Sequence, residues 1–174
     1  LEHACGLTSQ GAVYCWGHNN YGQIGNGQIT GTELTPTLAL LPQGVVAKSL
    51  SQGPSSHTCI ISTDGDLYCW GNNNRGQVGN GQICANWYGN SNPCNNGQSG
   101  IVVPELISMP LGVTVTSVSV GGEHTCALQQ SGEVRCWGED TSGQSSPPPG
   151  ESWSGLFLAQ NRSRKHEELN SWWR

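Results

Sequence analysis

The chain has 174 residues, of which 34% are hydrophobic and 11% charged, and it contains 25 glycines, 9 prolines and 8 cysteines. Its net charge of -5 and the scarcity of basic residues before residue 150 exclude nonspecific nucleic-acid binding, because phosphate neutralisation needs clustered lysine and arginine. Seven tryptophans exclude a disordered chain, and abundant glycine and proline favour many short strands over long helices.

The chain carries one unit three times, beginning at His3, His57 and His124. Each unit has a His-x-Cys triplet, a glycine and a Cys-Trp-Gly triplet, with its two cysteines ten positions apart. Repeats of roughly 50 residues predict a propeller or an array of repeats, since one unit cannot bury its apolar faces alone. The expected boundaries are residues 1–44 (repeat 1, without its first strand), 45–112 (repeat 2), 113–150 (repeat 3) and 151–174 (a tail outside the repeats).

In chain order, each full repeat begins with an alternating strand segment, at 45–51 and 113–120. A hairpin follows. In repeat 2 a turn at 63–65 places Cys59 opposite Cys69 and Ile61 opposite Leu67. Directly opposed strand residues lie within disulfide reach. The same spacing predicts four disulfides, between the following cysteines: Cys5 and Cys15, Cys59 and Cys69, Cys84 and Cys94, Cys126 and Cys136.

These bonds predict an oxidising location, which is extracellular, at the cell surface or luminal. The alternative is a zinc site that combines cysteines with the histidine of each unit. Short C-x2-C spacing is absent and the pair Cys84 and Cys94 has no companion histidine, so no metal site is predicted. The three histidines are expected instead to satisfy backbone groups where the strands begin.

On the hairpin face away from the cysteines lie Trp16, Trp70 and Trp137. Apolar residues on both faces of a hairpin predict burial from both sides, as in blades packed face to face. We expect the tryptophans to form the core between blades; stacking on a ligand is the alternative.

Repeat 2 contains an insertion at residues 84–97, closed by Cys84 and Cys94. Long loops in compact repeats often carry binding function, and aromatic side chains on a braced loop make good interface anchors. Trp87, Tyr88, Asn86 and Asn90 are therefore the candidate binding residues. A surface insertion whose aromatics pack back onto the blade remains the alternative.

Repeat 3 keeps Gly143 and Gln144 but continues into a Ser-Ser-Pro-Pro-Pro-Gly segment, so its last strand should be shortened. Beyond it, Asn161 begins an Asn-x-Ser sequon and is a candidate for glycosylation. The chain has no initiating methionine and no apolar run near 18 residues. We interpret it as a fragment whose start and any secretion signal lie upstream, and no transmembrane segment is expected.

The repeats resemble those of the regulator of chromosome condensation family through the His-Thr pair, Trp70-Gly71-Asn72 and the Gly-Gln-x-Gly-x-Gly segment at residues 76–81. The added cysteines resemble its secreted, bacterial-type branch. The resemblance covers residues 1–150 and implies an all-β fold: blades of a β-propeller, typically seven blades of four strands. Three repeats form only an incomplete arc, so self-association is expected if the chain is complete.

These observations predict a non-catalytic extracellular or cell-surface module that binds a protein or glycan, without nucleic acid and without a cofactor. The resemblance implies two alternatives, since nuclear members exchange guanine nucleotides on a small GTPase and the superfamily includes a secreted β-lactamase inhibitor. A structural subunit of an assembly is a further alternative. Catalysis is not predicted, because no G-x-S-x-G elbow occurs, bridged cysteines cannot act as nucleophiles, and Asp64 and Asp66 are expected to support a turn.

Overall fold

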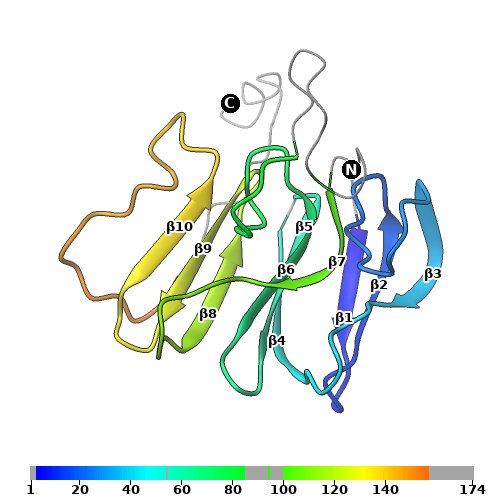
Figure 1. The fold of residues 1–174 in the computed structure, drawn as a ribbon, viewed down its shortest axis with the longest axis horizontal. Coiled ribbons are helices and arrows are strands. Elements are labelled where there is room, and N and C mark those ends of the chain that lie inside the picture. Colours follow the sequence, from blue (N-terminus) through cyan, green and yellow to red (C-terminus); the bar gives the residue numbers. More distant parts are fainter. Residues whose placement is uncertain (1–2, 54, 85–93, 95–99, 157–174) are drawn as a thin grey trace, which may run out of the picture.

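The computed structural model describes residues 3–53, 55–84, 94 and 100–156. These residues form strands and turns but no helix, and the strands make three antiparallel sheets arranged side by side like blades (Figure 1). The strands are β1 (His3–Leu7), β2 (Val13–His18), β3 (Thr32–Leu38), β4 (Ala47–Gln52), β5 (His57–Ser62), β6 (Leu67–Asn72), β7 (Gly100–Leu106), β8 (Val115–Val120), β9 (His124–Gln129) and β10 (Val134–Gly138).

Each sheet is one propeller blade. Blade 1 has the strand order β1-β2-β3, blade 2 the order β4-β5-β6-β7, and blade 3 the order β8-β9-β10. Only blade 2 has four strands within the described ranges. Among the described residues, blade 1 has no counterpart of the first strand β4, and blade 3 has none of the outer strand that β3 and β7 supply in the other two blades.

The central hairpin of each blade has the register predicted from the cysteine spacing. Cys59 lies opposite Cys69, and Ile61 lies opposite Leu67. The turn between them places Gly65 at a φ of 85°, in the left-handed region that glycine adopts without steric cost, and its N–H donates to the carbonyl of Ser62 at 3.1 Å. The hairpins of blades 1 and 3 repeat this arrangement.

Four disulfides join cysteines that are ten positions apart. They link Cys5 to Cys15, Cys59 to Cys69, Cys84 to Cys94, and Cys126 to Cys136. In the three hairpins the bonded Cα atoms are 4.1 to 4.2 Å apart, the short spacing of a directly opposed pair that is not hydrogen-bonded across the two strands.

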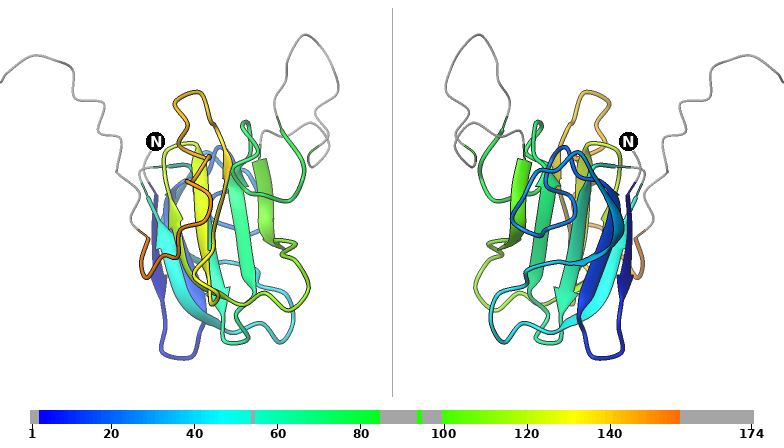
Figure 2. Two further views of the ribbon diagram at one scale, coloured as in Figure 1. Left: turned by 90° about the vertical axis from the view of Figure 1, so that its left-hand side faces the viewer. Right: turned by 90° about the vertical axis from the view of Figure 1, so that its right-hand side faces the viewer.

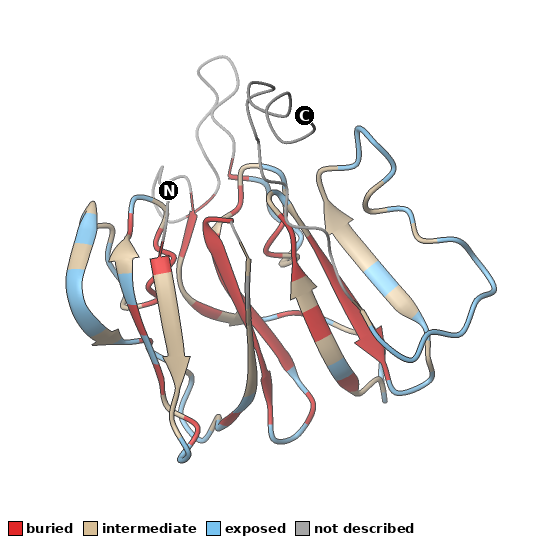
Figure 3. Ribbon diagram, turned by 180° about the vertical axis from the view of Figure 1, so that it is seen from behind, coloured by how far each residue is buried: buried red, intermediate tan, exposed pale blue. Residues whose placement is uncertain are grey.

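The blades pack through their inner strands: β1 lies against β4, and β4 and β5 lie against β8. Side views show strands of all three blades running in similar directions, with the loops gathered at their ends (Figure 2). Blade 2 lies between the others and is the most buried (Figure 3). Every described residue of β5 is buried, whereas β10 is mostly half-buried and β3 largely exposed.

Beyond β10 the chain turns at residues 139–150 and forms no strand there. It then returns to the blade 3 hairpin, where the N–H of Trp153 donates to the carbonyl of Gly132 at 2.9 Å. The N–H of Ala47 makes the same contact with Gly11. No helix in the described residues is long and apolar enough to span a membrane.

Candidate binding site

The blades are joined by a hydrogen-bonded cluster, which we call the seam. Between blades 2 and 3 its centre is the hydroxyl of Thr125, which donates to the backbone carbonyl of Gln77 at 2.7 Å. The ring of His57 lies 2.7 Å from the same hydroxyl through Nε2, and the indole Nε1 of Trp137 donates to the Gln77 carbonyl at 2.9 Å. His57, Thr125 and Gln77 are fully buried, so this polar network is shielded from water.

The seam between blades 1 and 2 is built in the same way. The hydroxyl of Thr58 donates to the carbonyl of Gln23 at 3.2 Å, and Nε1 of Trp70 donates to that carbonyl at 2.9 Å. Nε2 of His3 lies 2.8 Å from the Thr58 hydroxyl. Two seams with one hydrogen-bonding pattern show that the repeat encodes its own packing.

Two of the three tryptophans, Trp70 and Trp137, pack at these seams as the sequence predicted. Trp70 is fully buried, and a Cβ atom added to Gly25 of blade 1 would lie 2.6 Å from its Nε1 atom. Gly79 approaches Trp137 in the same way at the second seam. Trp16 belongs to blade 1 and is 36% exposed.

The seam also corrects the expected role of the histidines. His3 and His57 contact threonine side chains of the next blade rather than backbone groups at a strand entrance. Because the Thr125 hydroxyl already donates to a carbonyl, Nε2 of His57 carries the proton and donates, which leaves Nδ1 buried without a hydrogen-bond partner. Burial lowers the pKa of His57 to about 3, helped by the neighbouring His3 and His124, and burial lowers the pKa of His3 to about 4. The seam is therefore built for neutral imidazole.

The loops after β2 and β6 are held by a buried asparagine. Oδ1 of Asn73 accepts from the N–H of Val78 at 3.0 Å, and Nδ2 donates to the carbonyl of Gln82 at 2.9 Å. In blade 3 this position is Asp140, whose carboxylate accepts from the N–H of Ser145 at 2.7 Å. A carboxylate has no proton to donate to a carbonyl across the loop, and the other carboxylate oxygen of Asp140 instead accepts from the hydroxyl of Ser146 at 2.7 Å.

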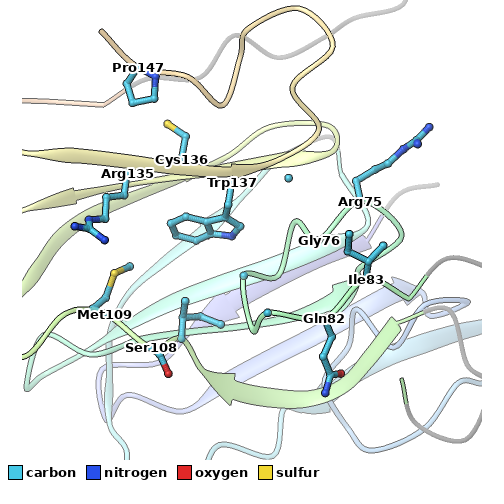
Figure 4. A pocket seen from close by; sticks show the side chains of 14 residues that line it. Arg75, Gly76, Gln82, Ile83, Ser108, Met109, Arg135, Cys136, Trp137 and Pro147 are labelled. Atoms are coloured by element: carbon cyan, nitrogen blue, oxygen red, sulfur yellow. The ribbon is translucent and has the colours of Figure 1, made fainter. Parts of the chain in front are cut away.

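A cavity of about 630 Å³ opens between the blade 2 loop and β10, and we call it the interblade groove. Figure 4 shows the indole of Trp137 lying in it, with Met109 and Ile83 also on its wall. Two guanidinium groups stand at its rim. Arg75 lies 3.1 Å from Glu139 and 3.6 Å from Glu123. Arg135 forms a separate, exposed ion pair with Glu133. The groove thus combines an apolar wall with charged side chains at its rim.

The predicted site residues fall in two groups. The eight cysteines lie in the disulfides given above, and the described residues hold no cluster of three or more His, Cys, Asp or Glu side chains that could bind a metal. The candidate binding residues Trp87, Tyr88, Asn86 and Asn90 lie outside the described residues, as does Asn161. The sequence reasoning missed the seam threonines and the interblade groove. The recurrence of threonine after histidine in repeats 2 and 3, at Thr58 and Thr125, was the available signal.

Comparison with known proteins places these blades in a family. A profile of the "Regulator of chromosome condensation (RCC1) repeat" matches residues 64–128, and a second profile with the same description matches residues 1–23, 47–77 and 115–144. The chain belongs to the regulator of chromosome condensation repeat family.

Its relatives are longer than the chain itself. It is 31% identical to the Ultraviolet-B receptor UVR8 of Arabidopsis thaliana over 82% of this chain and 29% of the receptor. It is also 31% identical to RCC1 domain-containing protein 1 of Homo sapiens, over 82% of this chain and 44% of that protein. Among solved structures, Prp20p of Saccharomyces cerevisiae aligns with a TM-score of 0.62 at 28% identity, covering 78% of this chain and 31% of Prp20p. The chain thus spans less than half of each.

Proposed function

We propose that this chain is part of an extracellular or cell-surface propeller that binds another protein and catalyses no reaction. The observation that carries the proposal is the disulfide inside every blade hairpin, joining cysteines such as Cys59 and Cys69 that are fully buried. Bonds of this kind persist in oxidising compartments and are rare in the cytosol and nucleus. The binding role is supported by family membership and by the name of the plant relative, which is a receptor.

The proposed contact surface is the insertion closed by Cys84 and Cys94, with Trp87 and Tyr88 as anchors. Both cysteines are buried, and the N–H of Cys84 donates to the carbonyl of Asn73 at 2.8 Å, so the base of the insertion is closed by a disulfide and held against the blade 2 loop. Fixing a loop in advance reduces the entropy that binding must overcome. Aromatic anchors on such a loop would then contribute most of the affinity.

Regulation of a small GTPase is a second candidate, because the Prp20p structure is described with that protein's binding properties to Gsp1p and histones. The disulfides favour the extracellular role over it. A secreted enzyme inhibitor and a subunit of a structural assembly share the oxidising location and differ only in the partner. The identity of the bound protein therefore decides among these alternatives.

The first test counts thiols. A membrane-permeant maleimide is applied to intact producing cells, the chain is then denatured in the same reagent so that buried thiols react, and the labelled cysteines are counted by mass spectrometry. None of the eight should be labelled if the chain lies in an oxidising compartment. Labelling of all eight would contradict the extracellular assignment, because the thiols would then be reduced where the protein works.

The second test concerns the loop. The chain is displayed on beads, crosslinked to surface proteins of the producing cells and compared with a Trp87→Ala/Tyr88→Ala variant. Trp153→Ala is the matched control, since Trp153 is an exposed aromatic outside the insertion, with 39% of its surface accessible. The double variant should lose the crosslinked partner and the control should keep it. Equal capture by all three proteins, or capture of a glycan alone, would overturn the proposed role of the loop.

A further inference from the structure

The outer edge of β10 has no neighbouring strand in the part of the chain that the structure describes. In blade 1 the matching edge of β2 is covered by β3, and in blade 2 the edge of β6 is covered by β7. Blade 3 ends its sheet at β10. An uncovered edge presents backbone N–H and C=O groups that can pair with an added strand.

The disulfide geometry identifies these backbone groups. Cys126 and Cys136 have Cα atoms 4.1 Å apart, as in an antiparallel pair without cross-strand hydrogen bonds. The N–H and C=O of Cys136 therefore point away from β9, toward the open edge, and those of Val134 do the same two residues earlier. In blade 2 the carbonyl of Leu67, which is the counterpart of Val134, accepts from the N–H of Ile107 at 2.8 Å.

The space that corresponds to the groove, between blades 1 and 2, is filled. Between blades 1 and 2 the strand β7 occupies the equivalent space, where the N–H of Gly27 donates to the carbonyl of Val102 at 2.9 Å. A Cβ atom added to Gly22 would lie 2.8 Å from the backbone of Val102, so the strand presses against the loop. The counterpart of Gly27 in blade 2 is Gly81, and a Cβ atom built there meets nothing within 4 Å.

We propose that the interblade groove binds an extended, aliphatic peptide segment of a partner protein, which adds to blade 3 as a fourth strand on β10. The chemistry of this occupant is given by β7, whose sequence is Gly-Ile-Val-Val-Pro-Glu-Leu. Its Ile101 is 1% exposed, and the groove is lined in part by the apolar side chains of Trp137, Ile107 and Met109. Main-chain hydrogen bonds supply affinity in strand addition, and side-chain pockets supply selectivity.

The half-exposed state of Trp137 fits this inference. Trp70 and Trp137 make the same indole bond to a glutamine carbonyl at 2.9 Å. Trp70 is fully buried beside β7, whereas Trp137 remains partly exposed in the groove. A strand in the groove would cover this apolar surface, which stabilises the bound state.

The test uses the full oxidised chain and a fluorescent peptide with the sequence of residues 100–107, and binding is measured by anisotropy. Cys69 pairs with Glu105, so the N–H of that glutamate faces the neighbouring strand while the N–H of Leu106 faces away. N-methylation of the peptide at the glutamate should weaken binding by at least about tenfold. The same methyl group at the following leucine is the matched control and should leave the affinity nearly unchanged.

Two variants test where on the protein the peptide binds. Ile83 lines the groove and is 56% exposed, so Ile83→Asp should weaken peptide binding. Leu111 is fully exposed and does not line the groove, so Leu111→Asp is the control. Amide hydrogen exchange followed by NMR should show new protection at Val134 and Cys136 when peptide is added.

Three results would overturn the inference: no saturable binding at millimolar peptide, equal loss with both N-methyl peptides, or protection of Val134 and Cys136 before any peptide is added. The last would mean that a segment of the chain itself fills the groove. The inference rests on the proposed protein-binding function, but its failure is distinguishable from failure of that function. The thiol count and the Trp87→Ala/Tyr88→Ala capture experiment do not depend on the groove.

Discussion

Replacement of Thr125 by valine tests the seam directly, because valine keeps the shape of threonine and removes only the hydroxyl. That hydroxyl makes two buried hydrogen bonds of 2.7 Å each, with the carbonyl of Gln77 and the ring of His57. The carbonyl keeps its bond from Trp137, whereas Nε2 of His57 loses its partner in a fully buried place. A buried donor left without an acceptor costs about 1–3 kcal/mol, so we expect Thr125→Val to lower the free energy of unfolding by that amount.

The assay is urea unfolding of the oxidised protein at pH 7.5, followed by tryptophan fluorescence. Thr116→Val is the control, because the exposed Thr116 hydroxyl donates to the carbonyl of Leu128 at 3.2 Å on the surface. Its cost should stay within about 0.5 kcal/mol. Equal costs for the two variants, with unchanged dependence on urea, would refute the argument that the seam hydrogen bonds hold the blades together.

Further predictions concern the effect of pH, of two glycine substitutions and of disulfide reduction on stability. Burial depresses the pKa of His57 to about 3 and that of His3 to about 4, whereas both titrate near 6.5 when unfolded. The unfolded chain therefore takes up protons first as the pH falls, and stability should decline below pH 6.5, by about 2 kcal/mol per histidine at pH 5; a urea midpoint that stays constant between pH 7 and 5 would contradict this. Gly25→Ala should destabilise more than Gly44→Ala, measured by thermal unfolding. Both glycines have positive φ, but a Cβ at Gly25 meets Trp70 whereas one at Gly44 meets nothing within 4 Å. Reduction of the disulfides should lower stability by about 2–3 kcal/mol per hairpin bond, and a chain whose urea midpoint is unaffected by dithiothreitol would argue against a structural role for the bonds.

The hairpins could be predicted from the sequence because their determinants are local. Ten-residue spacing of cysteines around a turn glycine fixes which residues face each other, and a slip by one residue would turn every side chain to the other face. The opposition of Cys59 and Cys69 therefore followed from counting along the chain. The repeat boundaries, including the one at residue 150, stay predictions. The contact of Trp153 with Gly132 shows that backbone pairing can continue where the sequence pattern fades.

The seam and the groove could not be predicted in the same way, because both join residues far apart in the chain. Thr58 meets His3 across 55 positions, and its place between His57 and Cys59 does not say which residue of another blade its hydroxyl will contact. The groove depends on which strand reaches the loop of the preceding blade. Between blades 1 and 2 this space is filled, because β7 runs past Gly22 and Gly27. Between blades 2 and 3 it is open, because no matching strand lies beside β10 among the described residues.

The two seams also show how this fold can vary its surface without losing its packing. Arg75 in the blade 2 loop takes the place of Tyr21 in the blade 1 loop, yet the backbone N–H of each bonds to the side-chain oxygen of a following glutamine, at 2.8 and 2.9 Å. Since the bonds that shape the loop use backbone groups and the buried Gln77 and Gln23, the side chains between them are free to change. Trp137 belongs to both the seam and the groove, but the buried seam residues His57, Thr125 and Gln77 do not line the groove. Substitutions at positions such as 75 and 135 would therefore change the affinity of a partner that contacts the rim. The loss of unfolding free energy caused by Thr125→Val would hardly change in such variants.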